Sequence, residues 1–159
     1  GFHMPTLTHA DRYAAEIFDV ILGDGMSSRL FQEVREKRGL CYAIKSNLEQ
    51  SKEYAYELIY AGTTKDKIPL IKKIVGREIK KIKKLSAAEL NQAKERLIGL
   101  RQIEKERADA TMIDLMQEEI AGDAQEYYNY ENHINKVKLK QVRSLSDVKK
   151  YSVAALVPQ

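Results

Sequence analysis

Apolar residues near the start of the chain recur every three or four positions, which is the spacing of one face of a helix. The residues that share this stripe are Tyr13, Ala14, Ile17, Phe18, Ile21 and Leu22. Thr8 or Asp11 can cap such a helix, and the turn Gly23-Asp24-Gly25 would end it. The short run Phe2 to Met4, broken by Pro5, is typical of a strand end.

The pattern then predicts a second helix and a change of period. Ser27 can cap a helix over 28–37, which Gly39 would end. After Gly39, large apolar residues alternate with other residues in two runs separated by a polar turn near 49–52, which predicts an antiparallel hairpin. The alternating positions are Leu40, Tyr42 and Ile44 in the first run and Tyr54, Tyr56, Leu58 and Tyr60 in the second.

The second half of the sequence is mainly helical in pattern. Isoleucine and valine spaced along 68–82 form one face, and seven Lys or Arg lie between Lys72 and Lys84. The sequence Ser86-Ala-Ala-Glu89 is a capping box and opens a long helix, which continues or breaks before Gly122. A further helix is expected over 125–137. The run 151–157, ended by Pro158, has the composition of a buried strand.

Strands and helices are therefore segregated along the chain instead of alternating strictly. This order predicts a two-layer α+β fold in which helices pack on one mainly antiparallel sheet. A chain of 159 residues suits one domain, and no low-complexity linker divides residues 1–159. We expect this single domain to be a fragment of a longer chain.

Charge and composition exclude several classes of protein. The net charge is +4, but residues 65–107 carry 14 Lys or Arg against 6 Asp or Glu, and residues 108–131 carry seven Asp or Glu and no Lys or Arg. Such alternating blocks are typical of solvated faces, and the basic block has no interleaved aromatic residue, so nucleic-acid binding is not expected. No apolar run reaches about 18 residues, so no membrane span is expected, and the start lacks a signal-peptide pattern. The single cysteine, Cys41, fits a reducing compartment such as the cytoplasm.

Most candidate chemical motifs are incomplete. The histidines His3, His9 and His133 are scattered, so no zinc ligand set is expected and we assign no catalytic residue to the chain. The segment Gly23-Asp24-Gly25 lacks the third glycine and the Gly-Lys-Ser/Thr of phosphate loops, so a tight turn between helices is the better interpretation. Cys41 lies within a predicted strand, where a cysteine is usually a small buried hydrophobe.

One segment carries a specific resemblance. The sequence LGDGMSSRLFQEVREKRGLCYAIKS, from Leu22 to Ser46, resembles a block in the second half of the pitrilysin, insulinase and mitochondrial processing peptidase family. The flanking GFHMP, the capping box and the terminal SVAALVP are similar to other parts of that half, so the resemblance covers nearly the whole chain. It implies one of two α+β halves facing each other across a cavity, where the other half holds zinc through His-x-x-Glu-His.

The resemblance also implies roles for individual residues. This half contributes an arginine and a tyrosine that hold the peptide substrate, and the matching positions are Arg35 and Tyr42. Gly23, Gly25 and Gly39 match its structural turns. The chain itself is then expected to bind no metal and to be inactive alone, with the zinc-binding half and a peptide as its partners. Because the sheet edge at the start of the chain has no predicted neighbour, a homo-oligomer is also possible.

Two alternatives stay open on the sequence. The first is a structural homologue that keeps the fold without peptidase activity. The second is an independent binding module unrelated to peptidases. The presence of Arg35 and Tyr42 together favours the substrate-binding half.

Overall fold

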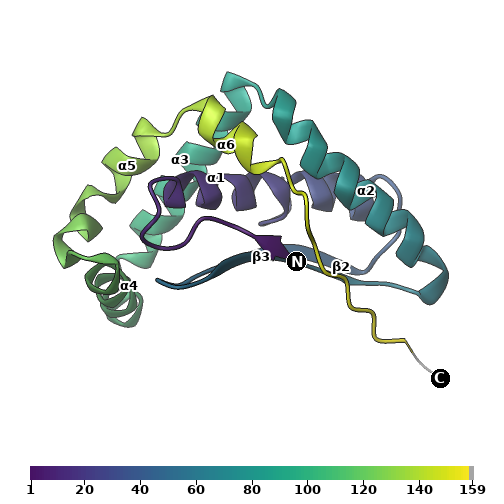
Figure 1. Ribbon diagram of the computed structural model, residues 1–159, viewed down its shortest axis with the longest axis horizontal. Coiled ribbons are helices and arrows are strands. Elements are labelled where there is room, and N and C mark those ends of the chain that lie inside the picture. The colour runs from purple at the N-terminus through teal and green to yellow at the C-terminus, as the bar shows by residue number, and fades with distance from the viewer. Residues whose placement is uncertain (158–159) are drawn as a thin grey trace.

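A three-stranded antiparallel sheet forms the floor of the domain in the computed structural model, which describes residues 1–157. The strands β1 (Phe2–His3), β2 (Ala43–Gln50) and β3 (Ala55–Gly62) lie in the spatial order β1-β3-β2. The hairpin register pairs Ala43 with Gly62. Helices cover one face of this sheet, and the other face is open within the described residues (Figure 1). The expected two-layer α+β fold is confirmed.

The helix α1 (Arg12–Leu22) is the centre of the hydrophobic core. Ile17, Phe18 and Leu22 are fully buried, so the apolar stripe read from the sequence is the packed face of this helix. The Phe18 ring meets Phe2 of β1 edge-on, with 6.2 Å between ring centroids. Full burial of each such side chain contributes roughly 1.5–3 kcal/mol to folding. The predicted helix and its end at Leu22 are therefore confirmed.

The helix predicted over 28–37 has an unusual final part. Helical structure begins at Arg29, and Phe31–Glu36 forms the π-helix η1, in which the Lys37 amide donates to the Gln32 carbonyl at 3.0 Å. A π-helix accommodates one more residue per turn, and such segments occur frequently at functional sites. Gly39, with φ +57°, then turns the chain toward β2 in a backbone region that favours glycine.

Two long helices follow the hairpin. α2 (Ile68–Lys81) lies between the short turns η2 (Lys65–Lys67) and η3 (Ile82–Lys84). α3 (Ala87–Glu104) begins with the predicted capping box: the Ser86 hydroxyl accepts from the Glu89 amide at 3.1 Å, and the Glu89 carboxylate accepts from the Ser86 amide at 3.1 Å. The capping-box prediction is confirmed.

The chain turns after α3, so the next helix is a separate element. α4 (Ala108–Ala121) runs to Gly122, and the predicted helix over 125–137 divides into η4 (Ala124–Asn129) and α5 (Tyr130–Lys136). α6 (Leu139–Leu145) was not predicted, because seven residues are too few to establish a period. Within residues 1–157, no helix has the length and apolar character needed to cross a membrane.

The prediction of a buried strand over 151–157 is wrong for the described residues. This segment is extended but lies outside the sheet, and Tyr151, Val153 and Leu156 are exposed. Among the described residues, its backbone pairs only with Gly1, through two hydrogen bonds between Gly1 and Ser152 that are each 2.9 Å long. β1 has only two residues, so it offers too short an edge for a strand to add to. Pro158 lies outside the described residues.

The strand β3 carries its tyrosines on the open face of the sheet. Tyr54, Tyr56, Leu58 and Tyr60 are between 39% and 57% exposed, whereas the inward positions of β3 include Ala55, Glu57 and Ile59. The rings of Tyr54 and Tyr56 stack with 6.0 Å between centroids. The alternation of the second run therefore marks the uncovered face, whereas Ile44 of the first run is buried in the core.

Candidate functional site

Arg35 and Tyr42 lie on either side of the corner between η1 and β2. Arg35 is near the end of η1, and the Gly39 turn follows it within four residues. Tyr42 directly precedes β2, and its amide donates to the carbonyl of Gly62 at 3.0 Å, which ties it to the end of β3. The fold thus brings both residues to the same end of the sheet, although no direct contact joins their side chains among the described interactions.

Tyr42 presents its phenol outward from a fixed position. Its side chain is 72% exposed, and its ring lies against the backbone of Gly62, where any Cβ atom would collide with the ring. The Tyr42 hydroxyl lies 3.5 Å from the hydroxyl of Tyr60, which places it on the open face of the sheet. The contact with Tyr60 raises the pKa of Tyr42, so its phenol stays protonated and able to donate at neutral pH.

Arg35 differs from the other basic residues of its segment. Arg29 pairs with Glu89 at 2.6 Å, and Lys37 and Arg38 pair with Glu33 at 2.6 and 2.7 Å. Within the described chain, no carboxylate pairs with Arg35, whose guanidinium lies 4.8 Å from the centroid of the Phe31 ring. The ring orients the guanidinium without neutralising it. Arg35 is therefore an exposed cation whose hydrogen-bond donors are available.

Cys41 lies between these two residues in the sequence. It is half-buried, and burial raises the pKa of its thiol, while the nearby charges of Arg35 and Lys67 act in the opposite direction. A thiol with a raised pKa is mostly protonated at neutral pH and so a weak nucleophile. Cys41 therefore serves as a packing residue, which leaves Arg35 and Tyr42 as the chemical groups of this corner.

The described residues do not fit a zinc site. No three His, Cys, Asp or Glu side chains in residues 1–157 are arranged to hold a metal ion. His9 accepts from the Asp11 amide at 3.0 Å, and His133 pairs with Glu126 and stacks on Tyr13 with 4.7 Å between centroids. The two histidines therefore have local structural roles.

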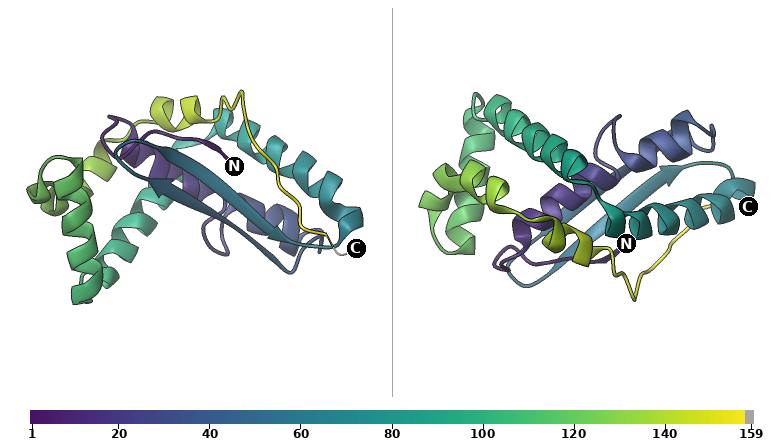
Figure 2. Two further views of the ribbon diagram at one scale, coloured as in Figure 1. Left: turned by 60° about the horizontal axis from the view of Figure 1, so that its bottom comes forward. Right: turned by 90° about the horizontal axis from the view of Figure 1, so that it is seen from above.

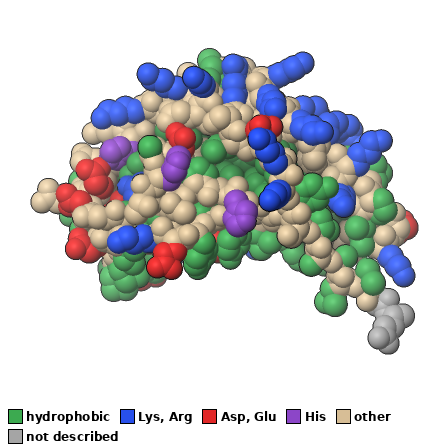
Figure 3. Space-filling view, in the orientation of Figure 1, with side chains coloured by type: hydrophobic (Ala, Val, Ile, Leu, Met, Phe, Trp, Pro, Cys, Tyr) green, Lys and Arg blue, Asp and Glu red, His purple; other side chains and the backbone are tan. Residues whose placement is uncertain are grey.

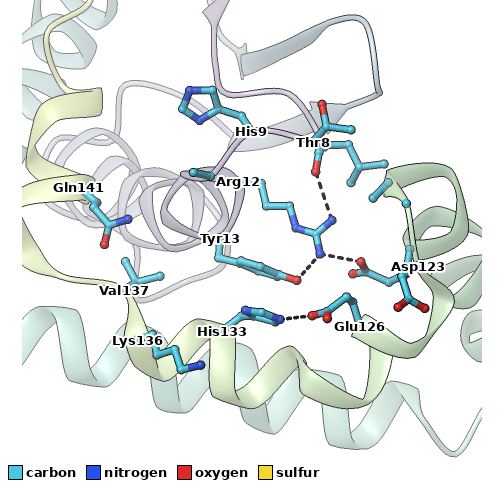
Figure 4. A pocket seen from close by; sticks show the side chains of 15 residues that line it. Thr8, His9, Arg12, Tyr13, Asp123, Glu126, His133, Lys136, Val137 and Gln141 are labelled. Atoms are coloured by element: carbon cyan, nitrogen blue, oxygen red, sulfur yellow. Dashed lines mark hydrogen bonds and ion pairs between the residues drawn. The ribbon is translucent and has the colours of Figure 1, made fainter.

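A cavity of about 440 Å³ lies away from this corner, between α1 and the α4–α5 region. Figure 4 shows the Arg12 guanidinium reaching toward the Tyr13 hydroxyl, with His133 facing Glu126. Arg12 also pairs with the buried Glu118 at 2.6 Å. Because these groups are paired with one another, we interpret the cavity wall as a structural network. The sequence could not predict this network, because Arg12 and Glu118 are 106 positions apart.

A second group of polar residues is buried between α1 and the sheet. Ser46 of β2 donates to the Asp19 carboxylate, and Glu57 of β3 is fully buried with no hydrogen-bond partner for either carboxylate oxygen in the described residues. Burial and then the neighbouring Asp19 raise the pKa of Glu57 to about 9. The sequence does carry a sign of this group, because Glu57 is an acidic residue at an inward position of an alternating strand.

Replacing Glu57 should make the folded state less sensitive to pH. Because the pKa of Glu57 is higher in the folded than in the unfolded chain, the folded state binds more protons, and stability falls as pH rises from about 4.5 to about 9. We expect Glu57→Gln to stabilise the chain more at pH 8 than at pH 5. Urea unfolding at both values measures this, with the exposed Glu53→Gln as control. An equal effect of Glu57→Gln at both values would contradict it.

Comparison with known proteins identifies the family. Residues 1–97 match the family model described as the Peptidase M16 inactive domain, which is more than half of the chain. The chain belongs to this family. A protein from Rickettsia felis named as an uncharacterized zinc protease is 41% identical over 99 residues, covering 61% of this chain and 24% of that protein. A protein of Bacillus subtilis named as the uncharacterized zinc protease YmxG is 26% identical over 164 residues, covering 99% of this chain and 40% of that protein.

Solved structures share the fold of this M16 domain. A protease from Helicobacter pylori superposes with a TM-score of 0.80 at 21% identity, covering 92% of this chain and 36% of that one. A peptidase M16 inactive domain from Pseudomonas fluorescens gives a TM-score of 0.68 at 23% identity, covering 90% of this chain and 35% of that one. The M16 domain thus spans well under half the length of these relatives, and the family resemblance read from the sequence is confirmed as that of a non-catalytic domain.

Proposed function

We propose that this M16 domain is the substrate-binding, non-catalytic half of a zinc-dependent metalloendopeptidase. It would complete the active-site cavity opposite a half that carries His-x-x-Glu-His and the zinc. Membership of a family of inactive domains, together with relatives named zinc proteases, supports this. The observation that carries the proposal is that Arg35, which is exposed and has no ion pair among the described residues, lies at the same end of the sheet as the outward-facing Tyr42. The other basic residues of its segment are ion-paired.

The two side chains suit a peptide backbone. A guanidinium and a phenol are both hydrogen-bond donors, and peptide carbonyls are acceptors. The planar fork of Arg35 fixes the direction of a bound carbonyl, which a lysine ammonium does not. Donors aimed at a carbonyl oxygen also stabilise the negative charge that develops there when the peptide bond is attacked. Arg35 and Tyr42 would therefore both hold the substrate and stabilise the transition state, and the zinc half would supply the activated water.

The residues that contact Arg35 and Tyr42 hold the two side chains in position before a substrate binds. Arg35 is held by the Phe31 ring, and Tyr42 is held by Gly62 and by the contact with Tyr60. Side chains whose positions are fixed before binding lose less entropy when a substrate arrives. Because Tyr42 and Tyr60 lie on the open face of the sheet, the zinc-binding half would close the cavity from that side.

This function predicts that activity needs both halves. The chain alone should hydrolyse no peptide and bind no stoichiometric zinc, because its ligand types are scattered. Mixing it with a separately expressed zinc-binding half should give hydrolysis of a fluorogenic peptide that neither half shows alone. Metal analysis of each protein measures the zinc. One tightly held zinc per copy of this chain, dependent on a histidine, would contradict the assignment.

The same mixture distinguishes the substrate-binding half from the alternative of a structural homologue without peptidase activity. If the two halves associate but the pair hydrolyses nothing, and the zinc-binding half is fully loaded with metal, the domain is a scaffold homologue. Activity of the pair that disappears on omission of this chain supports the substrate-binding half.

A further inference from the structure

We infer that the outward face of α4 is the surface on which the zinc-binding half docks. This α4 stripe consists of Met112, Ile113, Met116 and Ile120. The inference rests on the proposed function, since it takes the companion half as the partner, but it concerns a different part of the molecule from Arg35 and Tyr42.

The polarity of α4 is reversed relative to an ordinary surface helix. Its inward side carries Asp114 and the buried Glu118, which pair with Arg101 at 2.5 Å and Arg12 at 2.6 Å. The α4 stripe lies on the opposite side, because its members are spaced three or four residues apart and their side chains are 45% to 62% exposed. Surface helices normally place the apolar stripe inward. Because the ion pairs of α4 face the domain and its apolar side chains face solvent, a partner that binds this helix would bury the apolar side chains.

The position of α4 makes this surface accessible to a large partner. α3 and α4 form a helical arm at one end of the domain, and α4 extends past the level of the sheet toward its open side (Figures 1 and 2). Hydrophobic side chains gather along that lower edge of the molecule (Figure 3). Two of the stripe residues are methionines, whose flexible side chains adapt well to a facing surface. An apolar patch of this kind marks an interaction site.

Charge decides between the companion half and a second copy of this chain. Residues 108–131, which contain the stripe, include seven Asp or Glu and no Lys or Arg. Asp114 and Glu118 are paired on the inward side, and the exposed carboxylates of α4 are those of Asp109 and Glu119, within four residues of stripe members. A two-fold dimer through this face would bring two acidic segments together, because such an interface pairs the same patch with itself. The fitting partner has an apolar patch with Lys or Arg around it. The chain covers only 40% of YmxG, so relatives of this kind carry enough additional chain to supply a companion half.

The test measures binding between the two halves directly. The partner is the separately expressed zinc-binding half, and the dissociation constant is measured by isothermal titration calorimetry. Met116→Gln/Ile120→Gln should weaken binding at least about tenfold, because apolar anchors dominate interface energies. Leu70→Gln on α2 is the matched control, since Leu70 is 46% exposed like Ile120, and it should leave binding unchanged. Raising NaCl from about 50 to about 500 mM should weaken the parent complex, because Asp109 and Glu119 are exposed on α4 within four residues of stripe members, and salt screens exposed charges.

The outcomes separate this inference from the proposed function. If Met116→Gln/Ile120→Gln binds as tightly as the parent with its melting temperature unchanged, the inference is wrong and the function stands. If the parent chain does not bind the zinc-binding half at all, both fail. If the double variant instead abolishes self-association seen for the parent by sedimentation, the occupant is a second copy and the inference is overturned.

Discussion

Arg35→Ala in the complete two-half enzyme is expected to lower kcat/KM about 100–1000-fold while leaving the stability of this domain almost unchanged. Removal of one donor aimed at a reacting carbonyl typically costs about 2.7–4 kcal/mol of transition-state stabilisation. Arg35 is exposed and makes no ion pair in the described chain, so its loss should change unfolding by only about 0.5 kcal/mol. The measurements are peptide hydrolysis kinetics and thermal unfolding of the same preparations.

Tyr42→Phe tests the second donor with a smaller structural change. It removes only the hydroxyl, so the ring contact with Gly62 remains and the expected loss of turnover is of the same order. The double variant should lose less than the sum of the two single losses, because both groups hold one substrate segment. Lys37→Ala is the control: Lys37 lies on the same turn but is paired with Glu33. Turnover within about threefold of the parent for Arg35→Ala and Tyr42→Phe would disprove the clamp.

The elements that the sequence predicted well are those fixed by local patterns. The apolar stripe of α1, the alternation of the hairpin and the capping box at Ser86 each depend on residues within one or two turns. The predictions failed where distant contacts decide the outcome. The run 151–157 has a strand-like composition, but β1 offers it only a two-residue edge. The alternation at Tyr54–Tyr60 located a strand, yet it did not reveal that the larger residues face outward.

The candidate site could be located from sequence only through the family resemblance. Nothing in the spacing of charges distinguishes Arg35 from Arg29, Lys37 or Arg38. The structure distinguishes Arg35, because Arg29 forms an ion pair with Glu89 on α3, and Lys37 and Arg38 form ion pairs with Glu33. The sequence alone also did not reveal the reversed polarity of α4, since the inward Glu118 pairs with Arg12 of α1, which is 106 positions away. Ion pairs between distant segments are properties of the tertiary structure.

That ion pair should also be the point at which α4 is most easily destabilised. Arg12 and Glu118 are 9% and 7% exposed and lie 2.6 Å apart. Arg12→Met leaves the Glu118 carboxylate buried without a cation, and breaking a buried pair in this way costs about 3–5 kcal/mol. For a chain of this size, we expect the melting temperature to fall by roughly 6–20 °C. Urea unfolding of the chain gives the free energy directly.

The double variant shows whether the cost comes from the uncompensated charge. Arg12→Met/Glu118→Leu removes both ions and replaces them with apolar side chains, which is often close to neutral at a buried site. It should therefore be more stable than Arg12→Met alone, with part of the loss remaining because Arg12 also donates to the Leu7 carbonyl at 3.1 Å. Arg107→Met is the control, because its pair with Asp109 on the same arm is exposed and should contribute little to stability. If Arg12→Met costs no more than Arg107→Met, the buried pair does not anchor α4, and the reversed polarity of this helix must be stabilised elsewhere.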